Sequence, residues 1–359
     1  YEVQICAMEE GRPNLYPDWA SFRRFSLVPG EDGCLRVTCD FPTEQEYLIE
    51  IFSEPGKRLV RLSVYALARD MAGRYPFRGD LHMHTCRSDG REAPDIVCAN
   101  YRAAGYDFLS ITDHRMVTKP DPAEIPEGLV MIPGIELDYT MPDQWVHIQG
   151  LGVTEAVMDN YDRNGNPQDG IDRINECGGL AMLNHPAWSL NPPEYIASLK
   201  GVFGAEVWNS VSTIPYNVIR ADSSSLLDVA ASRGADMFWL ANDDVHSYGT
   251  DFAHGWNMVQ AEEKTAESIL AALAAGRFYA TQGPAFHQVE YDGDTVRVQC
   301  SPASAILFYS NLPWAAERCF LGENLTEAVY SIQGSETFVR VQIIDANEKS
   351  AWTSPVQVK

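Results

Sequence analysis

Short apolar segments alternate with amphipathic ones between about residues 76 and 285, and this alternation is the feature that most limits how the chain can fold. The apolar segments predict short strands, and several segments between them predict helices that end at a glycine, such as Gly105. Strands connected by helices favour a parallel sheet, and seven strands in about 200 residues predict a barrel-like α/β fold. The predicted strands cover residues 80–84, 107–112, 130–133, 145–151, 180–184, 205–208 and 237–241, and the predicted helices cover residues 92–104, 169–177, 223–233 and 265–275.

Histidines and carboxylates recur at the ends of these predicted strands. His82 and His84 are two positions apart on the first strand, and their side chains point the same way because side-chain direction alternates along an extended chain. Six of the eight histidines in the sequence occupy such positions. The carboxyl ends of barrel strands converge on one mouth, so we expect these side chains to form a single cluster. Its predicted members are His82, His84, Asp89, His114, Glu136, His147, His185, Asp244 and His246.

The chemistry of this predicted cluster is that of a metal site. Nine nitrogen and oxygen donors with no obligatory thiolate are too many for one ion, and they suit two or three divalent ions of zinc, manganese or iron. A carboxylate such as Glu136 can bridge two ions, and a hydroxide held between them is a strong nucleophile near neutral pH. Asp80, Asp113 and Asp243 are adjacent in sequence to these donors and could orient the imidazoles, although each could equally cap a turn.

The charge balance restricts the partners of the chain. It has 27 basic and 50 acidic residues and a formal net charge of −23, which disfavours nucleic acid because phosphate backbones bind basic surfaces. A small phosphorylated substrate is compatible with this charge, since bound divalent cations reverse the field locally. No apolar run approaches the ~18 residues of a membrane span, so we expect no membrane partner. The eight scattered cysteines favour reduced thiols in a cytoplasmic protein.

The segments on either side of the central region have a β-rich pattern. Residues 1–74 predict an accessory module with strands near residues 34–39, 46–52 and 59–67, separated by turns such as Pro55-Gly56. In the last of these strands apolar and polar residues alternate, which suits a sheet with one buried face. Strand patterns return after residue 285 and predict a small β-sandwich-like module. The predicted domains are therefore residues 1–74, 75–285 and 286–359.

Several motifs of the central region resemble those of the PHP (polymerase and histidinol phosphatase) superfamily. They are His82-Met83-His84-Thr85 with Ser88-Asp89-Gly90, Thr112-Asp113-His114, Pro133-Gly134-Ile135-Glu136, Asn184-His185-Pro186 and Asp244-Val245-His246. Three further segments resemble the CehA/McbA-like branch of PHP metallohydrolases, which includes carbaryl hydrolase. These segments are Gly178-Gly179-Leu180-Ala181, Glu206-Val207-Trp208-Asn209 and Ala275-Gly276-Arg277-Phe278-Tyr279. The resemblance covers about residues 76–285 and does not extend to the flanking modules.

This resemblance implies a distorted seven-stranded β/α barrel with a di- or trinuclear metal site. Matched motif by motif, it assigns the first ion to His82, His84, Glu136 and Asp244. It assigns the second ion to Glu136, His147 and His185, and the third to Asp89, His114 and His246.

We therefore expect a metal-dependent phosphoesterase that attacks a small phosphorylated metabolite with a metal-bound hydroxide. Four basic residues on loops after the predicted strands are candidates to bind the phosphoryl group: Arg87, Arg91, Arg115 and Lys119. We predict catalytic roles for Arg87, Arg115 and Asp113.

Two alternatives stay open at this point. The same machinery could cleave a carboxylic or carbamic ester, as the resemblance to carbaryl hydrolase allows. A pocket rich in cations would favour phosphate, whereas an apolar pocket lined by Trp145, Trp188 or Trp208 would favour the ester. The other alternative is a non-catalytic PHP module stabilised by metal, and the complete set of donors argues against it.

Overall fold

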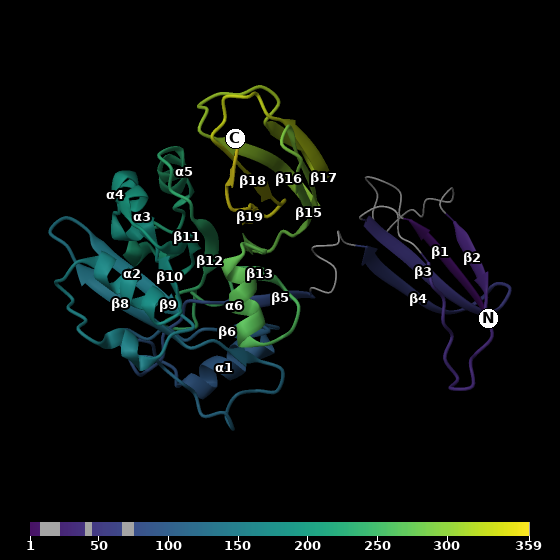
Figure 1. Ribbon diagram of the computed structural model, residues 1–359, viewed down its shortest axis with the longest axis horizontal. Helices are drawn as coiled ribbons and strands as arrows, with labels where there is room; N and C mark the ends of the chain where they lie inside the picture. The colour runs from purple at the N-terminus through teal and green to yellow at the C-terminus, as the bar shows by residue number, and fades with distance from the viewer. Residues whose placement is uncertain (8–21, 40–44, 67–74, 359) are drawn as a thin grey trace. The chain divides into compact units, whose positions relative to one another are not determined.

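The computed structural model describes residues 1–7, 22–39, 45–66 and 75–358 (Figure 1). The chain divides into two compact units, Tyr1–Arg74 and Tyr75–Lys359. All the predicted metal-binding residues belong to the second unit.

The first unit contains a four-stranded antiparallel sheet with the strand order β2-β1-β3-β4. β3 and β4 form a hairpin whose turn contains Gly56 at a φ of +79°, a conformation that glycine adopts without strain. Val3, Ile5 and Tyr47 form its buried core. The strands are β1 (Glu2–Ala7), β2 (Arg23–Ser26), β3 (Gln45–Glu54) and β4 (Lys57–Ala66).

Two expectations for this unit differ from the structure. Residues 34–39 form no strand. Val60 and Leu62 were expected on a buried face, but they are 39% and 50% exposed. β4 is the outermost strand of the described sheet and has a strand neighbour on one side only, which leaves its side chains less covered. Residue 67, at the end of the third predicted strand, lies outside the described residues.

The second unit contains a five-stranded mixed sheet with the order β12-β11-β10-β9-β8. β10, β11 and β12 are parallel, whereas β9 runs antiparallel to both of its neighbours. β8 is not among the strands predicted above. It forms a hairpin with β9 that is closed by a hydrogen bond from Met141 N to Gln144 O (3.1 Å), and so short a connection can join only antiparallel strands. The strands are β8 (Gly134–Thr140), β9 (Trp145–Leu151), β10 (Leu180–Leu183), β11 (Val202–Asn209) and β12 (Phe238–Asn242).

An eleven-stranded sheet completes the second unit, with the order β15-β16-β18-β19-β14-β13-β5-β6-β7 and with β17 on β16 and β20 on β18. β5, β6 and β7 are parallel, as predicted for the first three strands. The C-terminal strands join this sheet through the antiparallel pair of β14 and β19. The strands are β5 (Tyr75–Asp80), β6 (Phe108–Leu109), β7 (Val130–Met131), β13 (Trp256–Ala261), β14 (Phe278–Thr281), β15 (Phe286–Tyr291), β16 (Thr295–Ser310), β17 (Cys319–Ser331), β18 (Phe338–Ile344), β19 (Ser350–Trp352) and β20 (Val356–Gln357).

The described strands pair into open sheets and not into one continuous closed barrel. Two isolated bridges join the sheets where the predicted ligands lie. Met83, after β5, pairs with Val245, after β12, and His114 pairs with Glu136 on β8. Arg115 N donates to Glu136 O (2.8 Å) beside the second bridge. The architecture is therefore mixed α/β, with its sheets linked at the candidate site.

The four helices predicted from the sequence are present, each within two residues of the predicted ends. Polar caps define the starts of two of them. The Asn166 side chain accepts the Gln168 N–H (3.1 Å) at α2, and the Thr265 hydroxyl accepts the Ser268 N–H (3.2 Å) at α6. α2 packs on β9 and β10, and α6 packs on β13 (Figure 1). The helices are α1 (Pro94–Ala103), α2 (Pro167–Glu176), α3 (Pro186–Ser189), α4 (Pro193–Ser198), α5 (Ser224–Ser232) and α6 (Ala266–Ala274), with 3₁₀ turns η2 (Glu155–Met158), η3 (Val211–Thr213) and η4 (Pro215–Asn217).

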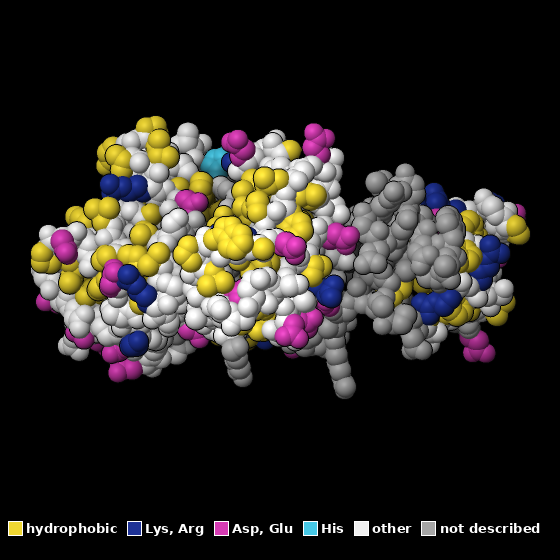
Figure 2. Space-filling view, turned by 90° about the horizontal axis from the view of Figure 1, so that it is seen from above, with side chains coloured by type: hydrophobic (Ala, Val, Ile, Leu, Met, Phe, Trp, Pro, Cys, Tyr) yellow, Lys and Arg dark blue, Asp and Glu magenta, His cyan; other side chains and the backbone are white. Residues whose placement is uncertain are grey.

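The described surface is mixed in character. On the face shown in Figure 2, the basic side chains of the described residues are scattered among acidic and apolar ones and form no continuous stripe. Of the helices in the described part of the chain, none combines the length and the apolar character that crossing a membrane requires.

A buried ion pair joins the C-terminal strands to α5. Arg340 on β18 is 1% exposed, and its guanidinium donates to both carboxylate oxygens of Asp228 on α5 (2.7 and 2.6 Å). The guanidinium also lies over the rings of Trp239 and Tyr309, at 4.4 and 3.9 Å from their centres. A buried charge is costly without a partner, so the packing of β18 on α5 depends on Asp228.

We expect Asp228→Ala to lower the free energy of unfolding by about 3 kcal/mol, because it leaves the Arg340 guanidinium buried without its partner. The measurement is urea unfolding followed by tryptophan fluorescence. Glu155→Ala removes the exposed partner of Lys119 and serves as the control, with little expected change. Equal unfolding midpoints for Asp228→Ala and the wild type would show that this ion pair does not hold the two elements together.

Candidate metal centre

A cavity of about 560 Å³ opens over the predicted cluster. Eight of the nine predicted ligand residues line it, and the ninth, His82, is fully buried next to His84. Segments that are far apart in sequence therefore deliver all nine side chains to one place. Seven of them follow β5, β6, β10 or β12, whereas Glu136 and His147 lie within β8 and β9 and not at the strand ends that the pattern predicted. The structure brings together the whole set that the sequence pattern singled out.

The first two histidines reach the cavity because the chain after β5 stays extended. Met83 between them pairs with Val245 and is completely buried in the apolar core. Its neighbours His82 and His84 therefore point to the opposite side, as side chains do in an extended chain. Their Nε2 atoms lie 3.3 Å apart. The prediction that both imidazoles face the same centre is confirmed.

Glu136 on β8 lies at the middle of the cluster. Its carboxylate is 1% exposed and contacts five imidazoles from four other segments of the chain. The oxygen–nitrogen distances are 3.3 Å to His82, 3.2 Å to His84, 3.2 Å to His114, 3.0 Å to His147 and 3.5 Å to His185. A carboxylate with both oxygens turned to separate groups of donors has the geometry of a bridging ligand.

The other two carboxylates complete the cluster on either side of His84. Asp244 Oδ1 lies 3.2 Å from His82 Nε2 and 3.1 Å from His84 Nε2. Asp89 Oδ1 lies 3.3 Å from His84 Nδ1, and Asp89 Oδ2 lies 3.5 Å from the Nε2 atoms of His114 and His246. The two ring nitrogens of His84 thus point toward different carboxylates, Nδ1 toward Asp89 and Nε2 toward Asp244.

The donors form overlapping triads in which all the candidate ligand atoms lie within 4.8 Å of one another. The triads are His82, His84 and Asp244; His82, Glu136 and His185; His84, Asp89 and His246; and His84, His114 and Glu136. The first triad lies within the group expected for the first ion. His147 belongs to none of the triads, although its Nδ1 approaches Glu136.

The protonation of the cluster reflects a concentration of buried negative charge. Burial disfavours a charged imidazole, but hydrogen bonds to Asp244 and Glu136 outweigh it and raise the pKa of His84 to about 10. Burial also disfavours an ionised Glu136, yet the nearby imidazoles, His82 first, hold its pKa well below the usual range. At His147 burial prevails over the attraction of Glu136 and lowers the pKa. The carboxylates therefore stay ionised and attract positive charge.

The donor set fits divalent cations. The Nε2 atom of His147 is buried and has no hydrogen-bond partner among the described residues, and such atoms are rare in folded proteins. The other donors are imidazole nitrogens and carboxylate oxygens, which suit zinc, manganese and iron. A bound metal ion would balance the negative charge of the carboxylates and would give the unpaired nitrogen of His147 a partner.

Glu206 on β11 orients the cluster from behind, and the search for donors at strand ends missed it. Its carboxylate is completely buried and lies 2.8 Å from Nδ1 of His82. It also accepts hydrogen bonds from the His185 backbone N–H (2.8 Å) and from the side chains of Asn209 and Asn242 (2.9 Å each). Such a carboxylate fixes the ring so that Nε2 faces the ligand position. Two signals in the sequence pointed to it: an acidic residue inside an apolar strand, and its place in the segment Glu206-Val207-Trp208-Asn209 that resembles the CehA/McbA-like branch.

Asp113 braces the loop that carries Asp89. It accepts hydrogen bonds from the Thr85 N–H (2.8 Å), the Thr85 hydroxyl (2.7 Å), the Ser88 hydroxyl (2.7 Å) and the Thr118 hydroxyl. Both oxygens of the Asp113 carboxylate therefore accept hydrogen bonds, and the residue is completely buried. The structure therefore places Asp113 as a positioning residue.

Asp80 and Asp243 form a buried pair beneath the cluster. The Tyr101 hydroxyl lies 3.0 Å from both carboxylates, and Asp243 accepts the backbone N–H groups of His254 and Gly255 (2.9 Å each). Burial and repulsion from Asp243 raise the pKa of Asp80. Both residues hold backbone segments in place, as in the turn-capping alternative considered above. The residue that orients the His82 imidazole is Glu206.

The four basic candidates have different surroundings. Arg87 and Arg91 are both exposed, but only Arg91 is among the residues that line the cavity. Arg115 donates to both oxygens of the buried Asp138 (3.0 and 2.9 Å), and Lys119 pairs with an exposed glutamate (2.8 Å). Of these four residues, Arg91 therefore lines the cavity, while Arg115 is paired with Asp138 and Lys119 is paired with Glu155.

No protein-family model matches the chain. A 5'-3' exoribonuclease of Haemophilus influenzae is 31% identical over 80 residues, which is 21% of this chain and 29% of that protein. The match thus spans less than a third of the length of this curated relative.

Three solved structures resemble the fold distantly. A two-domain protein from Bacteroides vulgatus that contains a predicted PHP-like metal-dependent phosphoesterase is 16% identical, with a TM-score of 0.46 over 79% of this chain and 96% of that one. A protein from Bifidobacterium adolescentis described as a metal-dependent phosphoesterase is 17% identical, with a TM-score of 0.34 over 48% and 88% of the two chains. An amidohydrolase from Chromobacterium violaceum with bound sulfate and no metal is 18% identical, with a TM-score of 0.33 over 48% and 89%. These likenesses are too distant to assign an activity.

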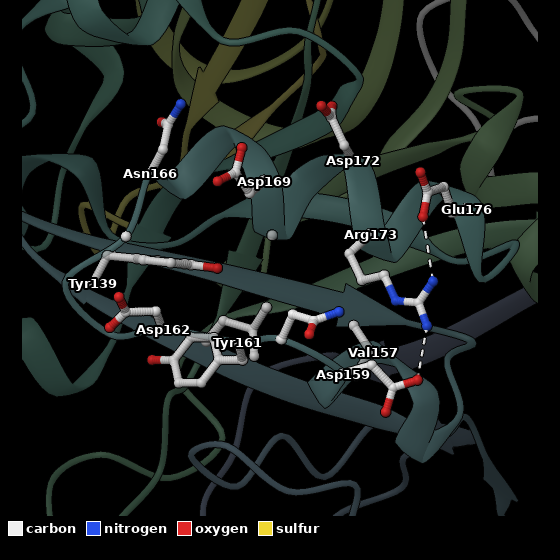
Figure 3. A pocket seen from close by; sticks show the side chains of 14 residues that line it. Tyr139, Val157, Asp159, Tyr161, Asp162, Asn166, Asp169, Asp172, Arg173 and Glu176 are labelled. Carbon is white, nitrogen blue, oxygen red and sulfur yellow. Dashed lines mark hydrogen bonds and ion pairs between the residues drawn. The ribbon is translucent and has the colours of Figure 1, made fainter.

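A second cavity, of about 370 Å³, lies beside α2 and has a different chemistry (Figure 3). Its polar lining is rich in carboxylates, such as Asp162 and Asp169, and none of its lining residues is a histidine. Its arginine, Arg173, donates to Asp159 (3.0 Å) and Glu176 (3.3 Å), as the dashed lines in Figure 3 show. Of the two cavities, only the first combines imidazoles with carboxylates.

We expect Glu206→Gln to weaken zinc or manganese binding by about 10- to 100-fold, because an amide in this position cannot accept from all four donors and no longer fixes the His82 ring. Isothermal titration calorimetry measures the affinity. Glu194→Gln changes an exposed carboxylate and is the matched control. If Glu206→Gln bound the metal as tightly as this control, Glu206 would have no role in orienting the ligands.

Proposed function

We propose that this chain is a metal-dependent hydrolase that cleaves a phosphoester of a small molecule. The observation that carries the proposal is the convergence of six histidines and three carboxylates around one cavity that also contains Arg91. Donors of this kind suit hydrolytic metal ions, and a guanidinium suits phosphoryl oxygens.

In this proposal the nine donors hold two or three ions of zinc, manganese or iron. When bound, such ions lower the pKa of a water molecule and offset the negative charge of the transition state. Of the chain's own residues, His82, His84, Glu136 and Asp244 would hold the first ion. Glu136, His147 and His185 would hold the second, and Asp89, His114 and His246 the third.

We also propose membership of the PHP superfamily and of its CehA/McbA-like branch. The order of the motifs along residues 76–285 supports this family. The bridges of Met83 with Val245 and of His114 with Glu136 join strand ends across the two sheets, which is compatible with a distorted barrel.

Arg91 is the residue of this chain best placed to orient the phosphoryl group. It is one of the residues that line the cavity, and its backbone N–H donates to His246 O (2.9 Å), which ties its loop to the cluster. In the hydrolysis, an oxygen from water bonds to phosphorus, the bond from phosphorus to the alcohol oxygen breaks, and the alcohol leaves with a proton. We therefore assign the binding of the phosphoryl group to Arg91 in place of Arg87 and Arg115.

A carboxylic or carbamic ester is the second candidate substrate, because Trp188 lines the cavity. Of the other two tryptophans considered above, Trp145 is 44% exposed and outside the lining, and Trp208 packs against Trp352 (ring centres 6.2 Å apart). A neutral ester would leave Arg91 without a function, which is why the phosphoester is preferred.

We expect zinc or manganese to stabilise the wild-type protein by about 2.7 kcal/mol for each ion bound when the metal concentration is a hundred times the dissociation constant of that ion. Glu136→Gln should lose most of this stabilisation together with the hydrolytic activity, because an amide lacks the charge that bridges two cations. Thermal unfolding with added metal or EDTA and elemental analysis are the measurements, with Glu194→Gln as the control. Fewer than two ions in the loaded wild type, or equal stabilisation of Glu136→Gln, would contradict the assigned site.

We expect Arg91→Ala to lower kcat/KM for a phosphomonoester about tenfold, because it removes a charge-assisted hydrogen bond to the phosphoryl group. Metal content should not change, since no nitrogen of this side chain belongs to the donor triads. Arg87→Ala removes the same side chain from an exposed position outside the cavity and should have less than a twofold effect. An equal loss in both variants would show that proximity to the cavity does not select the phosphate-binding arginine.

If neither arginine variant changes phosphoesterase activity while an aryl carboxylic ester is cleaved well, the second candidate replaces the first. The two classes of substrate are therefore assayed side by side on the metal-loaded protein.

A further inference from the structure

The lining of the cavity over the metal-binding cluster combines two kinds of side chain. Near Asp89 and His246 in the chain, Arg91, Ser247 and Asp251 are charged or polar. Trp188, Val211, Ile214 and Tyr216 form the apolar wall of the same cavity, a name used here for these four lining residues. The cavity therefore offers both a positive charge and apolar contact.

The apolar wall begins directly beside two of the predicted ligands. Trp188 lies on α3, which follows His185 in the chain. Its ring centre is 4.9 Å from that of His185 and 5.9 Å from that of His147, with the rings steeply inclined at 81° and 61°. A group attached to a phosphoryl held at the cluster would therefore meet the indole first.

The remainder of the wall comes from the turns η3 and η4, which have few polar groups to offer. The Ser212 hydroxyl donates to Asn209 Oδ1 (2.7 Å), and the Asn217 side-chain nitrogen donates to Val211 O (3.0 Å). Tyr216 is 89% exposed at the edge of the cavity. A large exposed aromatic ring next to half-buried apolar side chains is surface that a ligand can cover with a gain in free energy.

We propose that the substrate carries a compact hydrocarbon group, such as an aromatic ring, that packs against Trp188, Ile214 and Tyr216 while Arg91 and the metal ions bind its phosphoryl end. The inference rests on the proposed phosphoesterase function and specifies the alcohol part of the substrate. A sugar or another polyhydroxylated alcohol fits this wall poorly, because its hydroxyl groups would lose water against the side chains of Trp188, Val211 and Ile214, which carry no hydrogen-bond acceptor.

The test compares the binding of phenylphosphonate and methylphosphonate to the metal-loaded protein by isothermal titration calorimetry. Both probes present the same phosphonate group, and their carbon–phosphorus bond is not a phosphoester, so binding is measured without turnover. We expect phenylphosphonate to bind about tenfold more tightly, because the wall covers part of the ring. Equal affinities would overturn the proposal and leave the phosphoesterase function intact. Failure of both probes to bind a metal-loaded protein would remove the phosphoesterase function and this inference with it.

Variants of the apolar wall test whether its side chains cause the preference for phenylphosphonate over methylphosphonate. Ile214→Ala combined with Tyr216→Ala should reduce the ratio of the two affinities to below threefold and leave methylphosphonate binding unchanged. Ile219→Ala and Tyr291→Ala remove side chains of the same kinds that are exposed outside the cavity lining, and they should keep the wild-type ratio. Unchanged methylphosphonate binding also shows that the site of the double variant is folded. A wild-type ratio in the double variant would show that the apolar wall does not bind the hydrocarbon group.

Discussion

The organisation of the site depends on burying the carboxylate of Glu136. An ionised carboxylate with 1% exposure is costly unless positive charge and hydrogen-bond donors surround it. Five imidazoles approach it at 3.0 to 3.5 Å, and Asn184 donates to it at 2.6 Å. The backbone of the same residue forms the bridge to His114 that links the two sheets. Glu136 therefore supplies both the charge at the centre of the site and one of the two bridges between the sheets.

Around this centre the protein uses further buried acids as structural braces. Glu206 orients His82 and accepts the backbone N–H of His185, Asp113 holds the loop that carries Asp89, and the Asp80–Asp243 pair supports the chain on either side. Each of these carboxylates accepts hydrogen bonds from backbone N–H groups, which offsets part of the cost of burying it. Burial still raises the pKa of Asp80 and the pKa of Asp243.

The cavity adds selectivity to this reactive centre. Its lining includes eight of the metal donors, Arg91 with its positive charge, and the apolar side chains that begin with Trp188 next to His185. A substrate that satisfies all three has an anionic end and a hydrocarbon end. The helix that carries Trp188 follows His185 without a break, so the metal-binding and substrate-binding parts of the site are held by the same short segment.

The sequence by itself determined which side chains meet at the site and most of the helices. Seven of the nine donors follow strands, and alternation along an extended chain turns His82 and His84 the same way; both are local properties that a pattern reveals. Only the tertiary structure decided the hairpin of β8 with β9, the open pairing of the sheets, and the partners of the remaining charged residues. Arg115 is engaged because the hairpin brings Asp138 to it, and Glu206 meets His82 from 124 positions away. Such contacts depend on how distant strands pair, and neither composition nor spacing records that pairing.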